Sequence, residues 1–260
     1  MSKIQVNTIE LDYEDYGKGN VLLLLHGLGS SKKDWDSQVP FFSKTHRVIT
    51  LDLRGHGAST KPTDAYGVGL MTEDVKAFLD QLHIKKATFV GFSMGGAVAF
   101  QMAASYPEYV ENLVIVNSGP DFNDMGSIGE DLLNSRTHFL ETKGLTLLAK
   151  EISFNMFPED HQVDLRNAFE TRCKNNDYNA YYQSFVTLMD WGLGNQLEHI
   201  KARTLVVASD MDYTPIAFKE AYVERMQNAR LTLIENSRHG VVIDQPDAFN
   251  TALEKFLKDE

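Results

Sequence analysis

The most constraining feature of the sequence is an apolar strand that runs directly into a glycine-flanked serine and then into a helix. The stretch reads TFVGFSMGGA over residues 88–97. Lifting a serine hydroxyl off the end of a sheet forces a sharp, strained turn, and the positions two residues to either side must then be small. Gly91 and Gly95 flank Ser93 in this way. The stretch therefore predicts a nucleophilic serine on a strand–turn–helix elbow, beside the positive end of the helix dipole.

The rest of the chain alternates short apolar runs with helical patterns, which is typical of a mostly parallel sheet flanked by helices. This alternation is interrupted between residues 121 and 200, where helical patterns rich in aromatic residues replace the strand-like runs. We therefore predict an α/β core domain formed by residues 1–120 and 201–260, with a helical cap inserted at 121–200 over the carboxyl ends of the strands. Strands are expected at 21–25, 47–51, 87–90, 113–116, 204–208 and 231–234, and core helices at 72–82, 217–226 and 247–257.

Charge and composition narrow the class of partner. The formal net charge of −11 argues against a nucleic-acid partner and against anionic membrane surfaces. Residues 1–19 contain no apolar signal-peptide core, and the run Val21–Leu25 is far too short to span a membrane. Cys173 is the only cysteine, and the histidines form no metal-binding pattern. We expect a cytoplasmic protein that acts on a small molecule and needs neither a metal nor another cofactor.

A second glycine-rich turn follows the first long apolar run and invites comparison with nucleotide-binding loops. It reads HGLGSSK over residues 26–32. Lys32 stands where the last glycine of a Gly-x-Gly-x-x-Gly turn belongs, and the Gly-Lys-Ser/Thr ending of a phosphate loop is missing. The sequence therefore disfavours a dinucleotide or nucleotide site.

Three motifs in this order resemble the α/β-hydrolase superfamily, in its serine esterase, lactonase and perhydrolase-like branch. Residues 26–29 are similar to the oxyanion loop of that family, residues 52–59 (DLRGHGAS) to its Asp-x-Arg-Gly-x-Gly-x-Ser segment, and residues 91–95 to its nucleophile elbow. The resemblance extends over nearly the whole chain outside the cap. It implies the α/β-hydrolase fold and an oxyanion hole formed by the backbone N–H groups of Leu28 and Met94.

Most of the remaining residues of the second motif are expected to hold its loop in shape. Asp52, Gly55, Gly57 and Ser59 belong to this group, and Arg54 is expected to anchor a buried polar network. His26, which precedes the oxyanion glycine, is expected to be a structural hydrogen-bonding residue.

A serine nucleophile needs a neighbouring base, because its hydroxyl is weakly nucleophilic by itself. In the family that this chain resembles, the base lies on the loop after the last strand. His239 is the only histidine in that place. The family commonly has a glycine before this histidine, whereas this chain has Arg238, which leaves the shape of the loop open.

The resemblance also implies an acid that follows a late strand and orients the base. The segment after that strand reads SDMDYTP over residues 209–215. Aligning Ser209 with the glycine of the family's Gly-x-x-Asp pattern selects Asp212. The spacing to the following proline is one residue shorter than usual, so Asp210 is retained as an alternative, and Asp121 as a more remote one.

Together these residues predict a serine hydrolase that cleaves a small, largely apolar carboxylic ester, lactone or thioester through an acyl-enzyme. The same triad also supports cofactor-free perhydrolysis or hydrolysis of a carbon–carbon bond, and the fold can serve as a ligand-binding receptor, so these alternatives stay open. Within the cap, Met125, Met156 and Met189 are candidates to line an apolar pocket.

Overall fold

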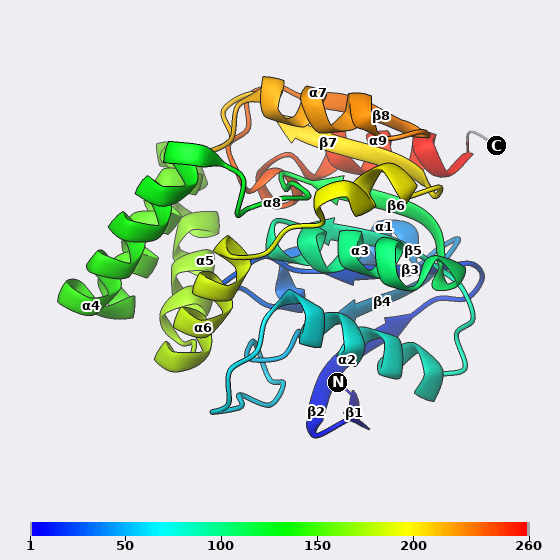
Figure 1. Ribbon diagram of the computed structural model, residues 1–260, viewed down its shortest axis with the longest axis horizontal. Coiled ribbons are helices and arrows are strands. Elements are labelled where there is room, and N and C mark those ends of the chain that lie inside the picture. Colours follow the sequence, from blue (N-terminus) through cyan, green and yellow to red (C-terminus); the bar gives the residue numbers. More distant parts are fainter. Residues whose placement is uncertain (1, 259–260) are drawn as a thin grey trace.

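The protein is described by a computed structural model that covers residues 2–258. Its centre is an eight-stranded sheet in the order β1-β2-β4-β3-β5-β6-β7-β8 (Figure 1). The pairs β1–β2 and β2–β4 are antiparallel, and every later pair is parallel, so the predicted mostly parallel sheet is confirmed. The strands are β1 (Ser2–Val6), β2 (Ile9–Tyr16), β3 (Val21–Leu25), β4 (Arg47–Leu51), β5 (Ala87–Phe92), β6 (Val110–Val116), β7 (Arg203–Ser209) and β8 (Ala229–Ile234).

Helices cover both faces of this sheet because the side chains of each central strand alternate between two apolar cores. In β3, Leu23 and Leu25 enter one core, while Leu22 and Leu24 enter the other. The first core is closed by α2 (Val68–Gln81), α3 (Met94–Ser105) and α7 (Ile216–Arg225), and the second by α1 (Val39–Phe42), α8 (Val241–Asp244) and α9 (Pro246–Lys258). Short 3₁₀ helices are η1 (Lys32–Trp35), η2 (Pro107–Tyr109), η3 (Asp160–Gln162) and η4 (Gly194–His199).

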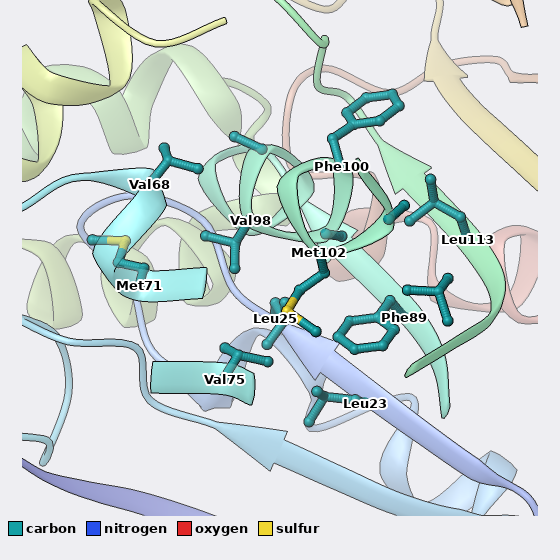
Figure 2. Close-up of a cluster of buried hydrophobic side chains, with 14 of the residues drawn as sticks. Leu23, Leu25, Val68, Met71, Val75, Phe89, Val98, Phe100, Met102 and Leu113 are labelled. Atoms are coloured by element: carbon teal, nitrogen blue, oxygen red, sulfur yellow. The ribbon is translucent and has the colours of Figure 1, made fainter. Parts of the chain in front are cut away.

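The first core fixes α3 against the sheet (Figure 2). Phe89 on β5 and Leu113 on β6 pack with Val98 and Met102 of α3, and all four side chains are fully buried. Burying each such side chain stabilises the fold by about 1.5–3 kcal/mol. This packing holds the N-terminus of α3 at the carboxyl end of β5, where the elbow serine lies.

Three helices form the insertion between β6 and β7 and lie together beyond the ends of the strands (Figure 1). They are α4 (Gly126–Met156), which is kinked at Gly144 with φ 79°, α5 (Val163–Lys174) and α6 (Tyr178–Met189). The segments that enter and leave the insertion run side by side, because the N–H groups of Phe122 and Asn123 both donate to the carbonyl of Trp191. The predicted helical insertion is confirmed, and the boundaries at 121 and 200 stay a prediction.

The structure differs from the sequence-based expectations near the N-terminus and at the start of α2. Two antiparallel strands, β1 and β2, lie in residues 2–16, where charged side chains obscure the apolar pattern. Helix α2 begins at Val68 rather than at residue 72, because Val68 and Met71 are buried in the core. Asp74 is the seventh residue of this helix, and it pairs with Arg54. None of the helices within residues 2–258 combines the length and apolar character needed to cross a membrane.

Candidate active site

Ser93 lies on the turn between β5 and α3 in a strained backbone conformation, with φ 51° and ψ −116°. A non-glycine residue in such a region costs on the order of 1–3 kcal/mol. The turn is also tightly packed, because a Cβ atom at Gly91 would lie 2.3 Å from the carbonyl oxygen of Gly95, and one at Gly95 would lie 2.2 Å from that of Leu25. The predicted strained elbow is confirmed.

His239 lies on the loop between β8 and α8, and its ring meets the carboxylate of Asp212. The His239 Nδ1 and Asp212 Oδ1 atoms are 2.5 Å apart, and the Asp212 side chain is 1% exposed. The His239 ring stacks on Tyr213, with 4.4 Å between the ring centroids. The structure therefore fixes the imidazole through one ring nitrogen and one ring face.

A buried lysine contacts the other oxygen of the same carboxylate. Lys219 Nζ lies 2.7 Å from Asp212 Oδ2 and 2.6 Å from Thr214 Oγ1, and its side chain is 0% exposed. Burial acts to raise the pKa of Asp212, but the charges of, and hydrogen bonds with, His239 and Lys219 outweigh it and hold that pKa well below its usual range. Asp212 is therefore ionised throughout the neutral range.

Sequence reasoning missed Lys219, although the helical spacing of α7 carries a signal. Lys219, Tyr222 and Met226 are the buried residues of this segment, and their spacing of three and four places them on one helix face. A lysine within a stripe that faces the core needs a buried anionic partner. That requirement points to an aspartate at the end of the preceding strand.

The two alternative acids have other partners. Asp210 accepts hydrogen bonds from the backbone N–H groups of Asn236 and Ser237, at 3.0 and 3.1 Å, and so shapes the loop that carries His239. Asp121 accepts the N–H of Gly194 at 2.7 Å, where the cap joins the core. Of the three aspartates considered from the sequence, the structure brings Asp212 to His239.

Asn117, which sequence reasoning also missed, ties the ends of three segments together. Its Nδ2 atom donates to the carbonyl of His239 at 2.8 Å and to Ser209 Oγ at 2.6 Å, and its Oδ1 atom accepts the Ser209 N–H at 2.9 Å. Asn117 has φ 42°, a conformation that asparagine tolerates better than most residues. A polar residue directly after the apolar strand β6 was the available signal.

The two expected oxyanion donors belong to the residue that follows Ser93 and to a loop that lines the same cavity. Met94 is the first residue of α3, so its N–H has no acceptor within the helix. Leu28 lies in a turn that follows His26. The Nε2 atom of His26 accepts the N–H of Leu53 at 3.0 Å, which leaves the proton on Nδ1 to be donated to the Gly27 carbonyl at 2.7 Å. The structural role expected for His26 is confirmed.

Residues around helix α5 hold the same loop from the cap side. Asn176 Nδ2 donates to the Gly29 carbonyl at 2.7 Å, and Arg172 Nε donates to Ser30 Oγ at 3.1 Å. Asp34, which accepts the Gly27 N–H, also pairs with Arg172 at 3.3 Å. The cap therefore contributes to the shape of the loop that carries Leu28.

Buried ion pairs also hold the loops that follow β3 and β4. Lys32 Nζ contacts the carboxylates of Asp12 and Asp52, and all three side chains are less than 5% exposed. Arg54 forms a bidentate pair with Asp74, at 2.6 and 2.7 Å. The expectation that Arg54 anchors a buried polar network is confirmed.

Ser93 and His239 line one cavity between the core and the cap. Most of the remaining lining is apolar, and the predicted contribution of Met125, Met156 and Met189 is confirmed. Further apolar lining comes from Leu28, Phe92, Phe122, Leu132, Ile152, Phe169, Tyr181, Phe185 and Leu188. In the part of the chain that the structure describes, no group of three or more His, Cys, Asp or Glu residues is arranged to hold a metal ion.

Comparison with known proteins agrees with the fold. A family model described as the alpha/beta hydrolase fold matches residues 20–246. The chain belongs to the α/β-hydrolase fold family. It is 29% identical over 257 residues to 3-oxoadipate enol-lactonase 2 of Acinetobacter baylyi, with 96% of this chain and 94% of that protein covered.

Solved structures share the whole fold of this α/β hydrolase. The enol-lactonase from Burkholderia xenovorans LB400 has a TM-score of 0.91 at 24% identity, covering 99% of this chain and 100% of that one. The esterase EaEST from Exiguobacterium antarcticum has a TM-score of 0.93 at 24% identity, covering 99% of both chains. The chain is thus similar in sequence to a protein named as an enol-lactonase, and it shares its fold with an enol-lactonase and an esterase.

The strain at Ser93 predicts an unusual stability effect. Replacing Ser93 by Gly removes the Cβ atom that makes φ 51° unfavourable, whereas Ser93→Ala keeps it. We expect Ser93→Gly to be more stable than Ser93→Ala by about 1 kcal/mol, after the entropic cost of glycine in the unfolded chain. Denaturant unfolding of the two variants measures the difference.

The matched control is Ala77→Gly, at an interior position of α2. There glycine is expected to lower the free energy of unfolding by about 1 kcal/mol. If Ser93→Gly were less stable than Ser93→Ala by as much as Ala77→Gly is less stable than the wild type, the backbone at Ser93 would be relaxed.

The buried Lys219–Asp212 pair predicts a second stability effect. Asp212→Asn leaves the Lys219 charge buried without its counterion, so we expect the free energy of unfolding to fall by about 3 kcal/mol. Adding Lys219→Met should restore a substantial part of the loss. As a control, Asp15→Asn breaks the partly exposed pair with Arg47 and should cost less than about 1 kcal/mol. Equal losses in the two single variants would contradict the buried pair.

Proposed function

We propose that this protein is a serine hydrolase that cleaves a small, largely apolar carboxylic ester, lactone or thioester through an acyl-enzyme. Ser93 is the nucleophile, His239 the base and Asp212 the acid. One observation carries the proposal: Ser93 and His239 line the same apolar cavity, while His239 Nδ1 is bound to a buried, ionised carboxylate 2.5 Å away. That pairing leaves Nε2 of His239 as the nitrogen that accepts a proton.

In the acylation step, Ser93 Oγ attacks the carbonyl carbon of the substrate while His239 takes the hydroxyl proton. His239 then gives this proton to the departing oxygen or sulfur atom as its bond to the carbonyl carbon breaks. In a lactone the departing oxygen stays attached to the acyl group. His239 next deprotonates a water molecule, which attacks the carbonyl carbon of the Ser93 ester. The bond from that carbon to Ser93 Oγ breaks, His239 returns the proton to Oγ, and the acid is released.

The negative charge that develops on the carbonyl oxygen is stabilised by the backbone N–H groups of Leu28 and Met94. Each such donor contributes about 3 kcal/mol of transition-state stabilisation. The dipole of α3 adds to this effect because its positive end lies beside Ser93. Fixing the loop from both core and cap keeps the Leu28 donor in place before the charge develops.

The polarity of the substrate follows from the side chains that line the cavity. Methionine and aromatic side chains surround the two catalytic residues, so the body of the substrate is apolar. The similarity to a protein named as an enol-lactonase, over 96% of this chain, supports an ester or lactone as the reacting group.

Two assays test this proposal. A fluorophosphonate probe should label the wild-type protein at Ser93 and should fail to label Ser93→Ala. With 4-nitrophenyl esters of two to eight acyl carbons, Ser93→Ala and His239→Ala should lower kcat by about 10⁴-fold or more. Asp212→Asn should lower kcat by about 10³–10⁴-fold, because the imidazole loses its orientation and its counter-charge.

Asp210→Asn is the matched control for the acid. This substitution weakens two loop hydrogen bonds but leaves the contact between His239 and Asp212, so we expect less than about a 10-fold loss. Full activity in Asp212→Asn together with a large loss in Asp210→Asn would overturn the assignment. Release of at most one equivalent of nitrophenol by the wild type would identify a binder rather than an enzyme.

A further inference from the structure

One cationic side chain interrupts the apolar lining of the cavity. Arg136, on helix α4 of the cap, borders the same cavity as Ser93 and His239. Of the described residues that line it, Arg136 is the only arginine or lysine. The triad geometry described above does not use this residue.

The guanidinium group of Arg136 faces rings and a thiol. It lies 4.9 Å from the centre of the Phe185 ring. Burial raises the pKa of the Cys173 thiol to about 12, and the positive charge of Arg136 acts against this shift. The guanidinium group also hydrogen-bonds the hydroxyl of Tyr181, and both this bond and its charge act to lower the pKa of that hydroxyl. Within residues 2–258, no carboxylate forms an ion pair with Arg136.

At least three other arginines of this protein have a carboxylate partner. Arg54 pairs with Asp74, Arg47 with Asp15 and Arg172 with Asp34. A charge beside apolar groups is most stable with a counterion, because hydrogen bonds and ring contacts replace only part of the hydration that the group loses. The half-buried Arg136 therefore lacks, in the protein alone, the counterion that its surroundings favour.

Arg136 also lies where this cavity meets a second hollow beside α4. Six residues border both spaces, and they are Met125, Leu132, Arg136, Ile152, Tyr213 and Thr214. A ligand that extends from Ser93 toward the second hollow therefore passes the guanidinium group. The mostly apolar wall in between suits a hydrocarbon segment with a polar group at each end.

We infer that Arg136 binds a carboxylate on the substrate, so that the preferred substrates are esters or lactones bearing a carboxylate away from the reacting carbonyl. A guanidinium group binds a carboxylate through two parallel hydrogen bonds. A single cation matches this singly charged group better than a phosphate dianion, which favours a second cation. The inference rests on the proposed function, because it concerns substrates of the same site.

The first test compares two substrates that differ only at the far end of the acyl chain. These are 4-nitrophenyl hexanoate and mono(4-nitrophenyl) adipate, with matched pairs of four to eight acyl carbons. At the best length, the wild type should favour the carboxylate ester. Arg136→Met should lower kcat/KM for that ester about 10–100-fold, as expected for a hydrogen-bonded charge pair, and change the neutral ester less than about 3-fold. Arg136→Lys should retain part of the preference.

Arg166→Met is the matched control. Arg166 also lies in the cap and packs over an aromatic ring, at 5.1 Å from the centre of Phe154, but it does not border the Ser93 cavity. This variant carries the same change in net charge and should keep the wild-type preference. An equal loss in both variants, or no loss in Arg136→Met, would overturn the inference.

A binding experiment separates this inference from the proposed function. Calorimetric titration of Ser93→Ala with monomethyl adipate and dimethyl adipate requires no turnover and no particular orientation of the ligand. The monoanion should bind about 10-fold more tightly, and the difference should vanish when Arg136→Met is added. If this binding is observed but the wild type hydrolyses no ester, the proposed function is contradicted and the Arg136 site is still supported. If the wild type hydrolyses the esters with the same kcat/KM for the charged and the neutral substrate, only the Arg136 site is contradicted.

Discussion

A backbone bend that only small neighbours permit holds the Ser93 hydroxyl at the carboxyl edge of the sheet. The carbonyl groups of Gly95 and Leu25 lie so close that a side chain at Gly91 or Gly95 would displace them. The apolar core beneath α3 keeps the strained turn from relaxing, because any shift would separate the helix from β5. The strain at one residue is thus stabilised by the packing of a whole layer.

The other parts of the site reach the same edge because parallel strands end there together. Strand β7 leads to Asp212 and β8 to the loop of His239, while Asn117 at the end of β6 links the two. Lys219 and His239 hold the Asp212 carboxylate from opposite oxygens. The cap adds apolar lining and Arg136, so in the proposed function the core supplies the reacting groups and the cap determines which substrates fit.

Most of the parallel sheet could be predicted from the sequence because its strands are buried on both faces and therefore read as continuous apolar runs. The elbow was predictable because its glycines are a steric requirement. Strands β1 and β2 were not, since exposed and charged positions dilute their alternation. The sequence did not reveal the roles of Lys219, Asn117 and Arg136. Each role depends on contacts between distant segments, and no local pattern indicates which groups lie opposite these side chains.

The most direct test of the account is the site of covalent modification during turnover. Wild-type protein is mixed with 4-nitrophenyl hexanoate, quenched with acid within milliseconds and digested for mass spectrometry. The account predicts a hexanoyl group on the peptide containing Ser93, formed and lost within one turnover. A hexanoyl group on another residue, or steady hydrolysis with no acylated peptide at any time, would contradict it.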